Sequence, residues 1–258
     1  MQTALIIIGV VIIVLFVAVQ VVKRKIVRGI CRYGAAKIYR QLRGVYGGAH
    51  HFKEADRAEF EDEVELGRYD EVRASVLEHD GCELGAIENL TVSEADPDHR
   101  TLLEVYKLAD GLACVSTYQL EDQQFVDVVS ETNDGKFIVT TNAVLDKLTP
   151  PPEVSKRVLD EDTPVADLFS AHMLGLHELE ESGELGAVIS FDSLGDVIDS
   201  QKRFTEHASK YRQSIGFLTE SEIFAMVEDE DGSKAGKMLW AEFQNVSRLG
   251  DEPGDCAA

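Results

Sequence analysis

Hydrophobic positions divide the chain into regions with three different patterns. Ala4 to Val22 is apolar on every side, residues 83–142 largely alternate between apolar and polar positions, and most of the remainder repeats with a helical period. An unbroken apolar run, a period of two and a period of 3.6 are typical of a membrane span, of strands and of helices, respectively. The sequence therefore predicts an α+β protein with an N-terminal membrane anchor.

The N-terminal run fits a transmembrane helix. Its 19 residues would extend roughly 28 Å at the helical rise, close to the hydrocarbon thickness of a bilayer. A cleaved signal peptide would carry positive charge before a shorter apolar core, whereas here the first three residues are uncharged and the basic cluster begins at Lys23. We predict a retained transmembrane anchor over residues 1–22.

Basic side chains dominate the segment after the anchor. Residues 23–46 hold eight Lys and Arg and no acid, arranged around an apolar stripe that predicts an amphipathic helix. Because positive charge beside a span stays cytoplasmic, we expect the N-terminus outside and the domain in the cytoplasm. Such a helix can also lie on anionic lipid headgroups, and an orienting charge cluster on a packed helix is an equally weighted alternative. The headgroup candidates are Lys23, Arg24, Lys25, Arg28 and Arg32.

An acidic linker is expected next. Gly47 and Gly48 interrupt the helical pattern, and Glu54 to Glu65 packs seven acids into twelve positions, which is typical of a solvated segment. We therefore expect a linker over residues 47–66, a cytoplasmic α+β domain over residues 67–250 and a disordered tail over residues 251–258.

The domain should begin with a helix and continue as an antiparallel meander. The helix is expected over 68–79, and strands are expected near 83–92, 102–109, 112–120, 125–131 and 136–142. Asp110-Gly111 predicts a two-residue type I′ hairpin turn, and Gly135 a second glycine-bearing turn. We expect Pro150 to Pro152 to end the sheet, and no parallel crossover, since no helix fits between the predicted strands.

The C-terminal part is expected to be helical. Apolar positions predict helices over about 163–182, 193–214 and 233–249, with a shorter helix after Thr219. Thr163-Pro164 is a typical helix start, and Thr219 and Glu222 have capping-box spacing.

Charge is distributed unevenly between the two ends. The first 50 residues carry eight basic groups and no acid, hence +8, whereas residues 51–258 carry 17 basic groups and all 47 acids, hence −30. A domain this acidic repels phosphates, so nucleic-acid binding is not expected. The lipid bilayer is the expected partner of the N-terminal helix, and a basic or membrane protein partner is a further candidate. The four cysteines show no CxxC or zinc spacing and fit a reducing compartment.

Candidate chemistry is sparse. His172 and His177 lie five residues apart, which places them about 140° apart around a helix, whereas zinc peptidases need a four-residue spacing. We interpret His172 as a hydrogen-bonded core or boundary histidine, and keep both histidines as pocket candidates for an enzyme. The sequence contains no GxGxxG, GxxxxGK[ST] or GxSxG motif. No catalytic residue, cofactor or metal site is therefore predicted.

Three functions follow from these patterns. The preferred hypothesis is a single-pass, membrane-anchored protein with an acidic cytoplasmic interaction or sensing domain. A membrane-bound enzyme, such as a hydrolase, is the first alternative and requires a pocket in which His172, His177 and carboxylates converge. A carrier of apolar ligands is the second alternative and requires a closed cavity inside the meander.

Overall fold

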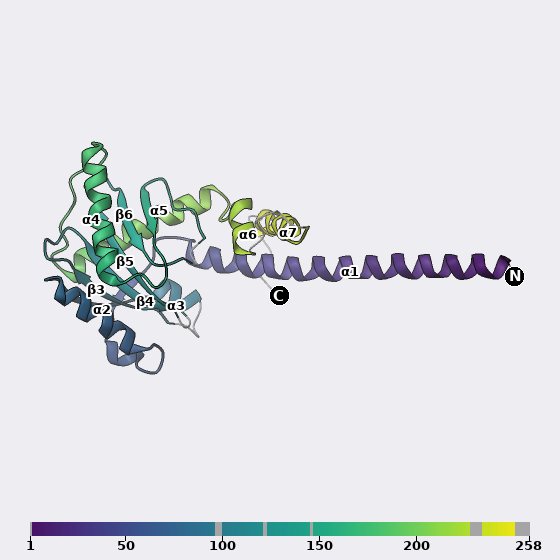
Figure 1. Ribbon diagram of the computed structural model, residues 1–258, viewed down its shortest axis with the longest axis horizontal. Helices are drawn as coiled ribbons and strands as arrows, with labels where there is room; N and C mark the ends of the chain where they lie inside the picture. The colour runs from purple at the N-terminus through teal and green to yellow at the C-terminus, as the bar shows by residue number, and fades with distance from the viewer. Residues whose placement is uncertain (1, 96–99, 121–122, 145–146, 228–233, 251–258) are drawn as a thin grey trace. The chain divides into compact units, whose positions relative to one another are not determined.

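The computed structural model describes residues 2–95, 100–120, 123–144, 147–227 and 234–250, with side chains from residue 23 onwards except Arg24 and Leu120. Within these residues the fold is mixed α+β, with seven α-helices and a seven-stranded sheet (Figure 1). The chain forms two compact units. Residues 43–217 form the sheet unit, and residues 1–42 with 218–258 form a helical unit.

The strands of the sheet follow one another in sequence order. Neighbours from β1 to β6 are antiparallel, and β6 pairs with β7 in parallel. The predicted antiparallel meander is thus confirmed for its five expected strands. The strands are β1 (Phe52–Glu54), β2 (Cys82–Asn89), β3 (Leu102–Lys107), β4 (Cys114–Leu120), β5 (Gln123–Glu131), β6 (Phe137–Thr141) and β7 (Val154–Val158).

Both predicted hairpin turns occur, but the type I′ assignment is wrong. Gly111 donates its amide hydrogen to the Leu108 carbonyl (2.9 Å), and Leu108 donates to Ala113 (3.0 Å). Gly111 has φ of 70°, whereas Asp110 does not have a positive φ, and a type I′ turn requires two successive positive values. The loop is a turn closed by a glycine bulge, and Gly135 (φ 81°) repeats the arrangement between β5 and β6.

The proline run does not end the sheet. β7 follows Pro150–Pro152 and lies parallel to β6, and the described residues of the connection (142–144 and 147–153) contain no helix. Two predictions, that the sheet ends at the prolines and that no parallel crossover occurs, are therefore wrong. The prolines precede an edge strand, where their missing N–H groups remove no hydrogen bond from the ladder.

The acidic segment 47–66, expected as a linker, contains β1 and a 3₁₀-helix, Arg57–Phe60. Phe60 is fully buried and packs with Tyr69 and Leu102. The Arg100 guanidinium lies 4.2 Å from the centre of the Phe60 ring. The acids face outwards while this ring fixes the segment to the sheet unit.

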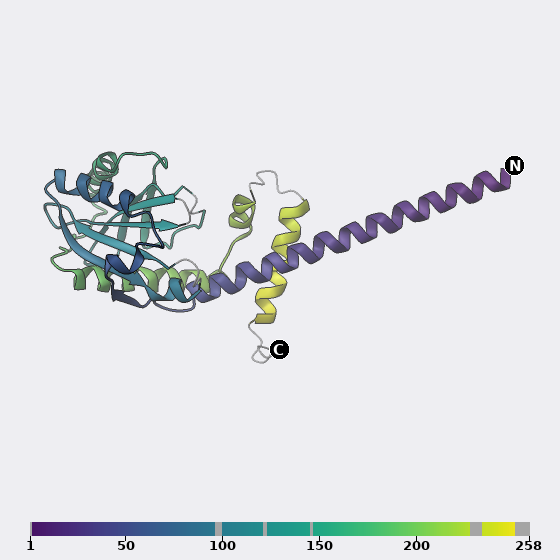
Figure 2. The ribbon, with the colours of Figure 1, turned by 90° about the horizontal axis from the view of Figure 1, so that it is seen from below.

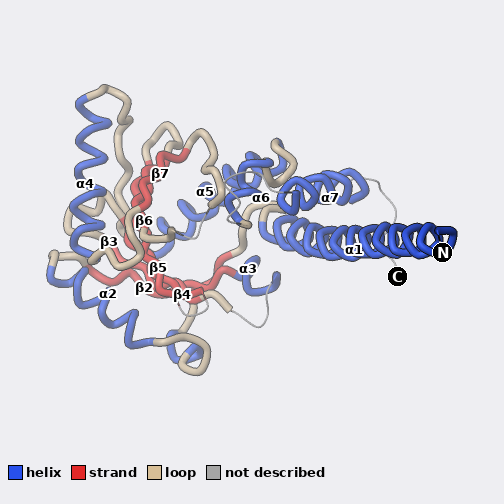
Figure 3. Tube along the Cα trace, turned by 45° about the vertical axis from the view of Figure 1, so that its right-hand side comes forward, coloured by secondary structure: helices blue, strands red, loops and turns tan. Residues whose placement is uncertain are grey.

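Helices cover both faces of the sheet (Figures 2 and 3). The first core contains side chains of α2 and α4 packed on Val115, Val126 and Val128, whereas the second packs α5 on Val105 and Val129. Alternate residues of a strand face opposite sides, so each face has its own apolar set. The helices of this unit are α2 (Leu66–Glu78), α3 (Leu90–Ala95), α4 (Val165–Glu181) and α5 (Leu194–Ser214).

The helical unit is formed by α1 (Gln2–Val45), which continues into the sheet unit, α6 (Glu220–Met226) and α7 (Lys234–Gly250). Tyr39 of α1 packs edge-on against Phe243 of α7, with ring centres 5.9 Å apart. Arg28 of α1 donates to Glu242 of α7 (2.6 Å). The predicted capping box at the start of α6 is confirmed.

The predicted anchor, Ala4 to Val22, lies in the helical backbone of α1, and its side chains are outside the described residues. The predicted tail, residues 251–258, also lies outside them. In the part of the chain that the structure describes, no helix has both the length and the apolar character that a bilayer crossing requires.

We predict that Phe60→Ala destabilises the sheet unit by about 3–5 kcal/mol, because it empties a fully buried aromatic site. Urea unfolding of the full-length protein in detergent, followed by circular dichroism, measures this change. Glu61→Ala, at the exposed neighbouring position, should change the free energy of unfolding by less than about 0.5 kcal/mol. Equal midpoints for both variants would show that the segment is a linker after all.

Candidate functional site

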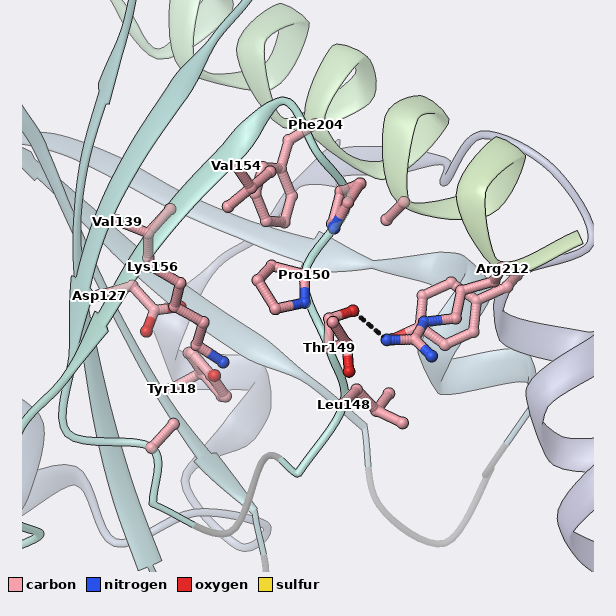
Figure 4. A pocket seen from close by; sticks show the side chains of 14 residues that line it. Tyr118, Asp127, Val139, Leu148, Thr149, Pro150, Val154, Lys156, Phe204 and Arg212 are labelled. Carbon is pink, nitrogen blue, oxygen red and sulfur yellow. Dashed lines mark hydrogen bonds between the residues drawn. The ribbon is translucent and has the colours of Figure 1, made fainter. Parts of the chain in front are cut away.

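A pocket of about 180 Å³ lies between α5 and the sheet (Figure 4). Its walls come from four strands, from the loop before β7, from α5 and from the segment after α1. The residues that line it are Tyr46, Tyr118, Asp127, Val139, Ala143, Leu148, Thr149, Pro150, Pro151, Val154, Lys156, Phe204, Ala208 and Arg212.

The strands form the floor of the pocket. Val126 and Val128 belong to the core beneath α2 and α4, so Asp127 between them faces α5. Lys156 lies directly opposite Val139 in the parallel pairing of β6 with β7, and both side chains line the pocket. The parallel β7 edge therefore places a lysine on the same floor as Asp127.

α5 forms the opposite wall. Phe204, Ala208 and Arg212 are spaced by four residues, so they share one face of the helix. Phe204 packs edge-on against Phe137 of β6, with ring centres 5.3 Å apart. The start of α5 is fixed by a capping box at Ser193, which sets where this face begins.

Arg212 holds the loop before β7 against the end of α5. Its side chain is only 3 % exposed, and it donates to the carbonyl oxygens of Thr149 (dashed line in Figure 4) and Phe217 (3.3 Å). A cation in the last turn of a helix is also stabilised by the helix dipole. The loop that carries Pro150 and Pro151 is thus attached to α5 through one buried guanidinium.

The two chain ends of the sheet unit meet beside the pocket. This unit begins at Arg43 and ends at Phe217. Gln213 donates to the Tyr46 carbonyl (2.9 Å), and Ser209 donates to the Gly48 carbonyl (2.6 Å). Tyr46 and Arg212, from opposite chain ends, both line the pocket.

The pocket combines charge with apolar surface. One acid (Asp127) and two bases (Lys156 and Arg212) lie among aromatic, aliphatic and proline side chains. Among the described residues that line it, none is Ser, Cys or His. The arrangement suits non-covalent binding of a small molecule that has an apolar body and a charged group.

His172 lies in the core between α4 and the sheet and not in the pocket. Ser130 donates its hydroxyl hydrogen to the Leu112 carbonyl (2.7 Å), so the hydroxyl can only accept from His172 Nε2 (2.9 Å). His172 Nδ1 then accepts from the Thr140 hydroxyl (3.2 Å). With its proton on Nε2, His172 cannot act as the base for Ser130. Burial keeps the imidazole neutral and lowers the pKa of His172 to about 4.

His177 faces solvent on the same helix. Its ring nitrogens lie 4.0 Å from Glu180 and 3.4 Å from Glu181. The structure does not bring His177 near His172, and neither lines the pocket.

The headgroup candidates are exposed on α1. This holds for Lys23, Lys25, Arg28 and Arg32, whereas the side chain of Arg24 is outside the described residues. Arg28 is also paired with Glu242. Contact of this surface with lipid stays a prediction.

Two buried acids elsewhere in the sheet unit have structural partners. Glu131 accepts two hydrogen bonds from Arg203 of α5 (2.6 and 2.8 Å), and Glu88 accepts two from Arg100 (3.0 Å each). Hydrogen bonds from Arg100 lower the pKa of Glu88 to about 2. Each of these carboxylates is paired with an arginine, so both hold elements together and are poor candidates for acid–base chemistry.

Sequence reasoning missed the pocket. The four-residue spacing of Phe204, Ala208 and Arg212 was the available signal, but Asp127 and Lys156 share a face only because β7 joins the sheet in parallel. Among the described residues, no group of three or more His, Cys, Asp or Glu could hold a metal ion.

No family model, no curated protein and no solved structure matches this chain. A functional proposal therefore depends on the pocket, on the two chain ends beside it and on the sequence of the N-terminal run.

We predict that His172 makes stability fall as the pH decreases. Its folded pKa lies below the ordinary value of 6.5, so the unfolded chain binds the proton more readily and stability is lost between pH 6.5 and about 4. The full effect is roughly 3 kcal/mol. Urea unfolding at pH 7 and pH 5 should show a smaller loss for His172→Gln than for the unmodified protein.

His177→Gln is the matched control, because the same helix carries this histidine in solvent. It should retain the pH dependence of the unmodified protein. If His172→Gln also retained that dependence, the buried imidazole would not be its source.

Proposed function

We propose that this chain is a single-pass membrane protein, with its N-terminus outside, whose cytoplasmic sheet unit senses a small ligand in the α5–sheet pocket. One observation carries the proposal: the pocket wall includes residues from both chain ends of the sheet unit, Tyr46 and Arg212. The apolar run and the basic residues after it support the anchor and its orientation.

The chain passes between the two units only after Leu42 and after Phe217. Arg212 donates to the Phe217 carbonyl, and Phe217 adopts φ of 74°. A left-handed conformation costs a bulky residue about 1–2 kcal/mol, so neighbouring contacts must hold it. A ligand that engages Arg212 would alter those contacts, which connects pocket occupancy to the helical unit.

The lining residues favour a small ligand with an apolar body and an anionic group. The pocket has two cations and one anion within a region that carries a net charge of −30. Its volume is below the range of about 300–1,000 Å³ that holds drug-sized molecules. A single aromatic ring with one carboxylate is of the right size and charge.

Non-covalent binding of a small charged molecule fits this pocket better than hydrolysis or the carriage of purely apolar molecules does. A hydrolase that uses a serine or cysteine nucleophile with a histidine base lacks those groups among the described lining residues. A carrier of purely apolar molecules would gain nothing from desolvating Asp127, Lys156 and Arg212. A sensing role requires only that the ligand binds and moves the chain ends.

We predict that the chain is oriented with its N-terminus outside. In intact cells, a membrane-impermeant maleimide should label Thr3→Cys, because that position precedes the apolar run. The native Cys82, which is exposed on the sheet unit, should be labelled only after permeabilisation. Labelling of Cys82 in intact cells would reverse the orientation, and recovery of the protein in the soluble fraction would exclude the anchor.

We predict that benzoate binds to the full-length protein in detergent with a dissociation constant on the order of 1 mM or below. Benzyl alcohol and benzylamine, which share the ring but lack the negative charge, should bind at least about tenfold more weakly, since a charge-assisted hydrogen bond contributes about 1.5–3 kcal/mol. Ligand-detected NMR titrations measure all three.

Two pocket substitutions and one control substitution locate that binding. Lys156→Gln should weaken benzoate by about tenfold, whereas Lys202→Gln, at an exposed position of α5, should leave it unchanged. Ala208→Phe should fill the pocket and abolish binding without removing a charge. Equal affinity for all three probes, or unchanged binding to Ala208→Phe, would refute the assigned ligand class.

A further inference from the structure

An exposed apolar stripe runs along α1 immediately after the predicted anchor. Ile26, Ile30 and Tyr33 are 58 %, 66 % and 75 % exposed, although each is a large apolar side chain. Their spacing of four and three residues places them within a narrow arc of the helix surface. The opposite side of α1 carries the fully buried Ala35, and Tyr39 there packs on α7. Tyr39 and Ala35 are thus covered by other described residues, which leave the three stripe residues more than half exposed.

We propose that the stripe is the contact surface for α1 of a second copy of this chain, forming a parallel two-helix pair at the cytoplasmic side of the bilayer. The proposal rests on the membrane anchorage proposed above, because anchorage holds both copies parallel and in register. It also raises their effective concentration, which three side chains per copy would need for stable pairing.

The spacing of the stripe is that of a coiled-coil seam. Seam positions of paired helices alternate steps of four and three residues, as Ile26, Ile30 and Tyr33 do. The same steps lead back into the apolar run at Val19, so the seam can continue into the membrane. Lys23 and Lys37 occupy the seam positions on either side and limit the cytoplasmic contact to these three residues.

No charged residue flanks the seam between Lys23 and Lys37. Positions that flank the seam are occupied by Val27, Gly29, Gly34 and Ala36, all uncharged and mostly small. A side chain added at Gly29 would meet nothing within 4 Å, so a neighbouring helix has room to approach closely there. Arg28 and Arg32 project from other faces of the helix, and Arg28 is paired with Glu242.

The bilayer itself cannot cover the whole stripe. Tyr33 lies eleven residues beyond Val22, or roughly 16 Å along a continuous helix. The headgroup region extends only about 5–7 Å beyond the hydrocarbon on each side. A helix that leaves the membrane near its normal therefore carries Ile30 and Tyr33 past the lipid, where a protein surface is needed to bury them.

Disulfide scanning of the full-length protein in native membranes tests the proposal. The background carries Cys31→Ser, Cys82→Ser and Cys256→Ser and keeps the buried Cys114. Cysteines at positions 26, 30 and 33 should yield covalent dimers about fivefold more efficiently than cysteines at the exposed control positions 25 and 32, which face away from the seam. Equal yields at all five positions, or no dimer at any of them, would overturn the proposal.

A further variant tests whether crosslinking depends on the seam contact or only on the reactivity of the introduced cysteine. Ile30→Lys should reduce dimer formation through Tyr33→Cys by about fivefold, because it places two charges against each other in the seam. Leu249→Lys replaces an equally exposed apolar residue of α7 and should have no effect. An unchanged yield with Ile30→Lys would exclude the seam.

Fractionation of the same samples separates failure of the anchor from failure of the pair. If the protein is recovered in the soluble fraction but still crosslinks with the predicted periodicity, the pair stands and the anchor is wrong. If the protein is in the membrane but crosslinks without periodicity, or crosslinks to a heavier partner only, the self-contact is wrong and the anchor stands.

Discussion

Burial of the sheet on both faces is the constraint on which the rest of the sheet unit depends. All residues of β6 and five of the six residues of β3 are buried, because α2 and α4 cover one face and α5 covers the other. A strand that is enclosed in this way leaves no solvated side for a charged residue. Each acid on such a strand therefore needs a cation at hydrogen-bond distance. On β3, Glu104 lies 3.3 Å from Arg57, and at the buried end of β5, Glu131 meets Arg203, so these ion pairs follow from the layer architecture.

The same constraint explains why the pocket lies at the β7 edge. Over β5 and β6 the floor is filled by Phe137 and Val129, which pack under α5. Towards the end of α5 the helix faces Pro150 and Pro151, whose rings are compact and cannot fill the layer as a long side chain would. Arg212 spans the remaining gap by reaching two backbone carbonyls. A partly filled layer with one buried cation results, which is the physical origin of the pocket.

Local patterns predicted the elements better than their long-range pairing. Glycines at 111 and 135 marked both hairpins, and the 3.6-residue period located α4 and α5 to within two residues at each end. β1 has only three residues and lies in an acidic segment, and β7 follows three prolines. Neither strand therefore shows an alternating pattern long enough to be recognised against the residues around it. Glu131 and Arg203 are 72 positions apart, and no spacing rule links residues at that separation. The pocket depends on these missed features, since Lys156 reaches it only through the parallel register of β7.

The two proposals act on one helix. α1 is continuous from Gln2 to Val45, and Tyr46, the next residue, lines the pocket. The proposed seam ends at Tyr33, thirteen residues earlier in the sequence. If both proposals hold, a ligand that contacts Tyr46 and the pairing of two copies act on the same helix. By linkage, the factor by which the ligand changes pairing equals the factor by which pairing changes ligand affinity. The two proposals can therefore be coupled through the segment of α1 that leads from Tyr33 to Tyr46.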